Sequence, residues 1–135
     1  MRRFITQGLN EVSFHDSSIE RFTQSVDTVE ITLDWAKLTY EGSPLIVSRC
    51  VLTLEGVTNQ SLRPNKHTID CIGRQFSLIG DNESESDQKL TLGGFYEDPK
   101  EHTWIEWSST FSSFRLEWYG DVTLEDWQSG KLPPT

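Results

Sequence analysis

Apolar and polar residues alternate strictly along the stretch from Val29 to Trp35. The apolar positions are Val29, Ile31, Leu33 and Trp35, and they are separated by Glu30, Thr32 and Asp34. Successive side chains of a β-strand point to opposite faces of a sheet, so this pattern predicts a strand with one buried and one solvated face. Clean alternation is typical of antiparallel sheets, so it also favours an antiparallel arrangement.

The same alternation returns in shorter stretches along the rest of the chain. It is clear at Phe114, Leu116 and Trp118, and weaker at Cys50–Leu54, Phe76–Leu78, Leu90–Leu92, Trp104–Trp107 and Val122–Leu124. Turn-forming residues separate these stretches, namely Glu41–Pro44, the polar run Gly80–Asp87, Gly93–Gly94, Asp98–Lys100 and Gly120–Asp121. Gly, Pro, Asn and Asp favour turns, and we expect Gly80–Asp87 to form the tip of a hairpin.

Short strands separated by regular turn signals indicate a β-sandwich or a barrel. We predict an all-β fold, either an antiparallel two-layer sandwich or a partly open barrel, with about seven to nine short strands and at most one short helix. A chain of 135 residues has the usual size of one domain, so residues 1–127 are predicted to form a single β domain. Residues 128–135 contain two prolines and few apolar residues, which predicts a frayed C-terminal tail.

The stretch from Ser17 to Val26 supports two interpretations. A helix is indicated by a capping-box pair and by apolar residues at helical spacing, namely Ser17 with Glu20, and Ile19, Phe22 and Val26. Alternatively, residues 18–24 form a strand that pairs with Val29–Trp35 through a turn at Val26–Thr28. Local rules favour neither interpretation.

The charge balance restricts the classes of partner. Twelve basic residues stand against 21 acidic ones, a net charge of −9. Nucleic acids and anionic membranes are bound mainly through lysine and arginine, so neither partner is expected. The excess of acidic residues serves solubility, or it attracts a basic protein partner, because the electrostatic field of a negatively charged protein draws a positively charged one toward it.

The cysteine usage and the lack of a recognisable targeting signal indicate an ordinary cytoplasmic protein. Cys50 and Cys71 are too few for a disulfide framework or a zinc site, and both have aliphatic neighbours, which is typical of buried thiols. The pattern leaves open whether one bridge joins them. No N-terminal apolar segment resembles a signal peptide, and no apolar run approaches the ~20 residues of a membrane span.

The sequence offers no clear catalytic or metal-binding constellation. His15, His67 and His102 are far apart and share no ligand spacing. Adjacent strand residues point to opposite faces, so His15 and Asp16 are not expected to chelate together. We expect the side chains of Asp16 and Ser17 to satisfy backbone N–H groups in a turn. We therefore predict a non-enzymatic protein with no cofactor and no metal.

Acidic residues gather in three groups, which we interpret as solvated loops. They are Glu83, Glu85 and Asp87; Glu97, Asp98 and Glu101; and Asp121, Glu125 and Asp126. The second group leads into the segment Trp104–Trp107. Exposed tryptophan beside carboxylates suits a protein interface, so Glu97, Asp98, Glu101 and Trp104 are candidate partner-binding residues. The alternative, which we favour for the tryptophans, is membership of the core.

The N-terminal part of the chain resembles a bacterial group of small cytoplasmic proteins. The resemblance rests on Phe14-His15-Asp16-Ser17-Ser18-Ile19, on Val29–Asp34 and on Val51–Val57, and so covers roughly the first 60 residues. Glu55 stands where an aromatic residue is expected. The group includes uncharacterised domains and predicted immunity proteins of polymorphic toxin systems, which neutralise a cognate toxin. The resemblance implies that residues 18–24 form a strand, and it carries no catalytic residues over.

An acidic binding protein, specifically an immunity protein that docks on a basic toxin, is therefore our first functional hypothesis. The second is a small ligand-binding or scaffold domain of housekeeping type. The third is an enzyme whose active residues come from distant strands.

Overall fold

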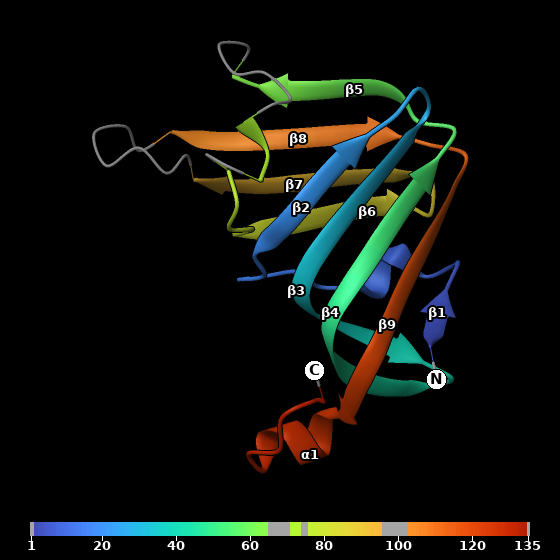
Figure 1. The fold of residues 1–135 in the computed structure, drawn as a ribbon, viewed down its shortest axis with the longest axis vertical. Coiled ribbons are helices and arrows are strands. Elements are labelled where there is room, and N and C mark those ends of the chain that lie inside the picture. The colour runs from blue at the N-terminus through green and yellow to red at the C-terminus, as the bar shows by residue number, and fades with distance from the viewer. Residues whose placement is uncertain (1, 65–70, 74–75, 96–102, 135) are drawn as a thin grey trace.

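The computed structural model describes residues 2–64, 71–73, 76–95 and 103–134, which fold into two open antiparallel sheets (Figure 1). The first sheet has the order β1 (Arg3–Ile5), β9 (Ser113–Thr123), β4 (Ser43–Glu55), β3 (Thr28–Tyr40) and β2 (Ile19–Gln24). The second has the order β5 (Thr58–Arg63), β8 (Trp104–Thr110), β7 (Lys89–Phe95) and β6 (Asp81–Ser86). A 3-10 turn, η1 (Leu9–Glu11), and a short helix, α1 (Leu124–Gln128), complete the described elements. The predicted all-β sandwich is confirmed, and the sheets do not close into a barrel.

The long β3–β4 hairpin is the centre of the first sheet. Its turn is formed by Glu41 and Gly42, which have φ of 50° and 81°. Positive φ at both central residues is the conformation that matches the twist of two paired strands. Each strand contains 13 residues, and the pairing runs from Thr28 opposite Glu55 to Tyr40 opposite Ser43. The predicted strand at Val29–Trp35 is therefore part of a longer one.

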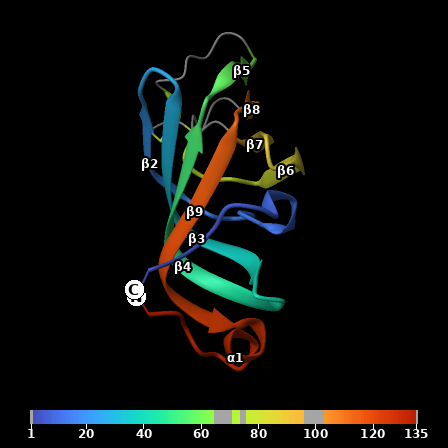
Figure 2. The same ribbon diagram turned by 90° about the vertical axis from the view of Figure 1, so that its right-hand side faces the viewer.

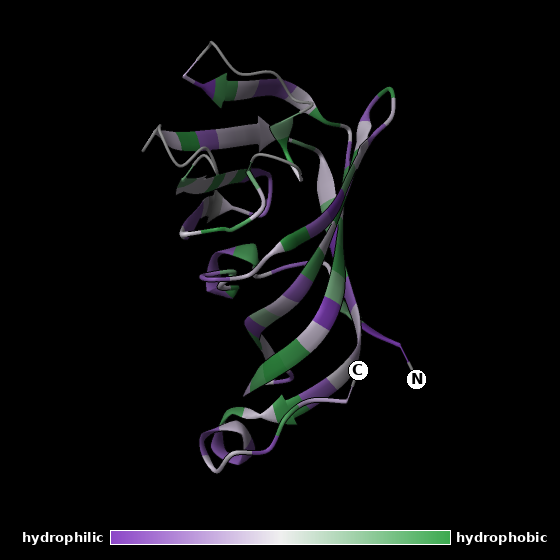
Figure 3. Ribbon diagram, turned by 60° about the vertical axis from the view of Figure 1, so that its left-hand side comes forward, coloured by the Kyte–Doolittle hydropathy of each residue, from purple (hydrophilic) through white to green (hydrophobic). Residues whose placement is uncertain are grey.

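The core lies between the two sheets. Figures 2 and 3 show the second sheet packed against one half of the first, while α1 lies at the other end. Phe22 of β2 and Trp107 of β8 meet edge to face across the layers, with ring centroids 5.6 Å apart. Phe22 therefore lies on a strand, and the strand interpretation of residues 18–24 is confirmed by β2, which pairs with β3.

Beyond the second sheet, the end of the β3–β4 hairpin is covered on both faces. Residues 45–48 are all buried, whereas the rest of β4 alternates. Leu45 and Val47 belong to the main core cluster, but Ile46 does not. The helix α1 packs on β4 and β9, so it covers the face that carries Ile46. Thr123 is the N-cap of this helix, and its hydroxyl accepts a hydrogen bond from the backbone N–H of Asp126 at 3.1 Å.

Three predicted turns lie largely within strands. The polar run Gly80–Asp87 is mostly the strand β6, which pairs with β7, and only Asp87 belongs to the turn of this hairpin. Gly93–Gly94 lies inside β7, and Gly120–Asp121 lies inside β9. The glycines are in these strands because other groups approach their backbone closely. A Cβ on Gly93 would lie 2.5 Å from the indole of Trp104, and a Cβ on Gly120 would collide with the carbonyl of Pro134.

The C-terminal segment after α1, expected to be frayed, makes specific contacts. Gly130 has φ of 93°, and its N–H donates to the carbonyl of Trp127 at 2.9 Å, which turns the chain at the helix end. Further on, the hydroxyl of Ser48 in β4 donates to the carbonyl of Pro134. The segment therefore lies against β4 and β9.

Candidate functional site

The segment Phe14–Ser17 crosses between the two sheets and is tied to both. The backbone N–H of Phe14 donates to Oδ1 of Asn82 in β6 at 2.7 Å, and Nδ2 of Asn82 donates to the carbonyl of Val12 at 2.9 Å. The Phe14 ring is fully buried. Next in the chain, the N–H of Asp16 donates to the carbonyl of Ile79 at 2.8 Å. The segment is thus a structural link between the layers.

Ser17 is fully buried and is the polar centre of this link. Its hydroxyl lies 2.9 Å from Oδ1 of Asp34 and 2.8 Å from the carbonyl oxygen of Trp35, and can donate to either. The same Oδ1 accepts from the backbone N–H of Ser18 at 2.7 Å. The carboxylate that satisfies a backbone N–H here therefore belongs to Asp34. The Ser17 hydroxyl accepts from the N–H of Trp35 at 3.4 Å, so the expectation of a bond to a backbone N–H holds for Ser17, whereas the Asp16 side chain makes no such bond to a described residue.

His15 and Asp16 also differ from the prediction. They lie in a turn rather than in a strand, so their side chains are not held on opposite faces. Nε2 of His15 lies 3.4 Å from Oδ2 of Asp16, and both side chains are largely exposed. Nδ1 of His15 donates to the carbonyl of Gly80. Asp16 has φ of 62°, a conformation that Asp and Asn tolerate better than most residues.

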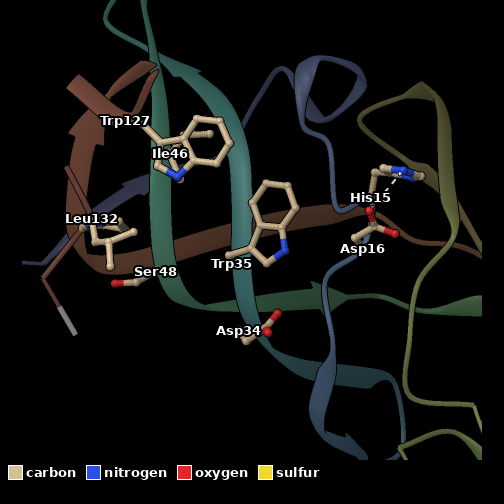
Figure 4. Close-up of a pocket in the computed structure, with 9 residues that line it drawn as sticks. His15, Asp16, Asp34, Trp35, Ile46, Ser48, Trp127 and Leu132 are labelled. Atoms are coloured by element: carbon tan, nitrogen blue, oxygen red, sulfur yellow. Dashed lines mark ion pairs between the residues drawn. The ribbon is translucent and has the colours of Figure 1, made fainter. Parts of the chain in front are cut away.

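A pocket of about 580 Å³ opens beside this segment (Figure 4). The described residues that line it come from the crossing segment, from β3 and β4, and from α1 and the C-terminal segment: His15, Asp16, Asp34, Trp35, Ile46, Ser48, Trp127, Leu132 and Pro133. Sequence reasoning missed this pocket. Alternation had assigned Trp35 to the core, and nothing in the local sequence places Trp127 opposite it.

A second candidate surface lies on the outer face of the second sheet. We call it the acidic aromatic surface and define it as Asp81, Glu83, Phe95, Trp104 and Glu106. The side chains of Asp81, Glu83, Trp104 and Glu106 line one shallow hollow of about 40 Å³. The ring of Phe95 meets that of Trp104 edge to face at 5.2 Å. Within the described part of the chain, no ion pair joins these three carboxylates to a lysine or arginine.

Contacts with neighbouring residues hold the Trp104 indole in place on this surface. Its side chain is 38% exposed, whereas Ile105 and Trp107 on the same strand are fully buried. Core membership is therefore confirmed for Trp107 and wrong for Trp104. The indole lies over Gly80 and Gly93, where a Cβ would come within 3.2 Å and 2.5 Å of it, and its Nε1 donates to Oε1 of Glu106 at 3.3 Å. The ring is thus held flat against the sheet.

The other predicted acidic residues have separate environments. Glu97, Asp98 and Glu101 lie outside the described residues. Asp87 is no solvated loop residue, because its Oδ1 accepts from the N–H groups of Gly8 and Leu9 at 2.9 and 2.8 Å. Asp121 accepts from Nε1 of Trp118 at 2.9 Å and pairs with Arg3 at 3.0 Å. Both carboxylates hold the fold together.

Cys50 and Cys71 are not joined in a disulfide, and both are buried. Burial raises the pKa of the Cys50 thiol to about 12, so it is protonated at neutral pH and is a poor nucleophile. Among the described residues, no group of three or more His, Cys, Asp or Glu side chains is placed to hold a metal ion. No helix in the described ranges is both long and apolar enough to cross a membrane.

Comparison with known proteins gives a negative result. No protein-family model, curated protein or solved structure matches the chain.

Proposed function

We propose that the protein is a non-enzymatic, cytoplasmic binding protein that docks on a basic protein partner through its acidic aromatic surface. The single observation that carries this proposal is Trp104, whose partly exposed indole lies over Gly80 and Gly93 beside three carboxylates that form no ion pair with a described lysine or arginine. Aromatic anchors at the centre of an interface dominate binding energy, and a preorganised anchor loses little conformational freedom on binding.

The charges around Trp104 define the partner. Asp81, Glu83 and Glu106 surround the hollow beside the indole, and the whole chain carries a net charge of −9. Such a surface attracts a partner with lysine or arginine side chains and repels an acidic one. The flat indole suits an arginine or lysine side chain laid across it, since cations bind the faces of aromatic rings.

The specific form that we propose is an immunity protein that neutralises a cognate toxin. The support is the resemblance carried by Phe14–Ile19 and Val29–Asp34, together with the acidic docking surface. Inhibition would follow from covering a basic face of the toxin, near the cleft that binds its substrate. The protein itself contributes no reacting group to this mechanism.

The test is binding to the product of the neighbouring upstream gene. The purified product is titrated with the wild-type protein and with the Trp104→Ala and Glu106→Gln variants. Tyr119→Ala is the matched control, because Tyr119 is also an exposed aromatic residue but lies on β9, in the other sheet. We expect Trp104→Ala to weaken binding by roughly 30-fold or more, the scale of an interface hot spot. Tyr119→Ala should bind as the wild type does.

Salt dependence provides the second arm. Surface charges are screened as ionic strength rises, so the association rate should fall between 50 and 500 mM NaCl. Co-expression should also protect cells from the gene product. A neighbouring protein that is neither toxic nor bound, together with no basic partner recovered from the native host, would end the immunity proposal.

A further inference from the structure

The pocket in Figure 4 lies apart from the acidic aromatic surface and has a chemistry of its own. Its volume of about 580 Å³ is within the range of small-molecule sites. No residue of the acidic aromatic surface lines it. The pocket and the acidic aromatic surface are therefore two separate candidate binding sites.

One half of the pocket is apolar. Trp127 of α1, Ile46 of β4, and Leu132 and Pro133 of the C-terminal segment form this half. Trp127 is 44% exposed and Leu132 is 76% exposed, although both line a concave space. Exposed apolar side chains gathered around a pocket are typical of ligand sites.

The other half is acidic. Asp16 and Asp34 lie beyond Trp35 as seen from Trp127 (Figure 4). Oδ1 of Asp34 is used by Ser17 and Ser18, whereas its Oδ2 makes no hydrogen bond to a described residue. None of the described lining residues is lysine or arginine. Of the described lining residues, this end therefore presents two carboxylates and neither lysine nor arginine, and His15 contacts one of the carboxylates, that of Asp16, at 3.4 Å.

The two indoles connect the halves. Figure 4 shows Trp35 and Trp127 on the same side of the β3 and β4 strands. Indole faces attract cations and pack well against flat apolar groups. From this arrangement we infer that the pocket binds a small organic cation, an apolar or aromatic body that carries one amine or quaternary ammonium group. The body lies between Trp127 and Leu132, and the cationic nitrogen lies beside Trp35 near Asp16 and Asp34.

A matched set of three probes tests the charge requirement. They are 3-phenylpropylamine, 3-phenylpropan-1-ol and 3-phenylpropanoate, which share one body and are cationic, neutral and anionic at pH 7.5. Each is titrated into the 135-residue protein while the indole N–H signals of its five tryptophans are followed by NMR. We expect the amine to move the signals of Trp35 and Trp127 and to leave that of Trp104 in place. It should bind about tenfold more tightly than the alcohol, and the carboxylate should not bind detectably.

Variants distinguish specific binding in the pocket from nonspecific binding to the protein surface. Trp127→Ala also assigns its own signal, and it should abolish the shifts at Trp35. Asp16→Asn keeps a residue that tolerates the positive φ but removes the charge, and it should lower affinity for the amine and not for the alcohol. Tyr119→Ala should bind all three probes unchanged.

Equal affinity for the amine and the alcohol would overturn the proposed charge selectivity. Shifts spread over all five indoles, or full binding by Trp127→Ala, would show that the pocket is not the site. Because Trp104 takes no part, these outcomes leave the proposed partner binding untouched, and failure of partner binding leaves this inference standing.

Discussion

Replacing Ser17 by alanine tests the role of the Phe14–Ser17 segment as a structural link. The hydroxyl is fully buried and lies 2.9 Å from a carboxylate oxygen of Asp34 and 2.8 Å from the carbonyl of Trp35. Hydrogen bonds to a charged group contribute about 1.5–3 kcal/mol, and because Asp34 is exposed, water can replace part of the bond that its carboxylate loses. Asp34 keeps its bond to the N–H of Ser18, so part of the network survives. We expect Ser17→Ala to lower the free energy of unfolding by about 2 kcal/mol.

The assay is urea denaturation followed by tryptophan fluorescence. For a slope of about 2 kcal/mol per molar urea, the midpoint should fall by about 1 M. The matched variant is Asp16→Asn, which alters a contact with His15 between largely exposed groups and keeps a residue that tolerates φ of 62°, so its unfolding free energy should change by less than ~0.5 kcal/mol. Asp16→Ala should lose about 1 kcal/mol through backbone strain alone. If Ser17→Ala were as stable as the wild type, or Asp16→Asn as damaged as Ser17→Ala, this account of the segment would be refuted.

Three further changes follow from the same structure. Burial raises the pKa of Cys50 to about 12 in the folded state against 9.0 when unfolded, so the folded state loses stability as pH rises above 9, and the loss levels off near 12. Between pH 8 and pH 10.5, the unfolding free energy measured by urea titration should fall by about 2 kcal/mol more in the wild type than in Cys50→Ala. Equal falls in the two proteins would contradict the burial of this thiol. Gly93→Ala places a Cβ 2.5 Å from the Trp104 indole, so it should lower the unfolding free energy by about 1–3 kcal/mol and weaken partner binding as Trp104→Ala does. Unchanged binding would show that the position of the indole over Gly93 does not matter. Gly120→Ala should displace the segment around Pro134, which would appear as faster proteolysis of the C-terminus and weaker binding of 3-phenylpropylamine, and an unaltered cleavage rate would contradict the contact with β9.

The strands that alternation predicted are those whose two faces have different environments. Val29, Ile31 and Leu33 face the core, and Glu30 faces solvent, so the pattern of two was readable. The same rule fails at residues 45–48, where α1 covers the face that would otherwise be wet. It also fails at β6, whose solvated side carries Asp81 and Glu83 and whose inner side carries the polar Asn82. A strand with polar residues on both faces resembles a loop in sequence.

Glycine was the second source of error. The local sequence predicts turns at Gly93 and Gly120, although each of these glycines leaves room for another group on its strand. The groups that need this room, Trp104 and Pro134, are distant in sequence, so no local rule reveals them. The candidate sites were hidden for the same reason: Trp35 and Trp127 line one pocket, and Asp81 and Glu106 another, only because separate strands bring them together.

The central claim is that Trp104, held over two glycines among Asp81, Glu83 and Glu106, is the anchor for a basic protein partner. The most direct measurement is the equilibrium dissociation constant of the upstream gene product for the wild type, Trp104→Ala and Tyr119→Ala, taken in one buffer at two salt concentrations. The account predicts at least a roughly 30-fold loss for Trp104→Ala, no change for Tyr119→Ala, and weaker binding at high salt. Equal constants for wild type and Trp104→Ala would contradict it.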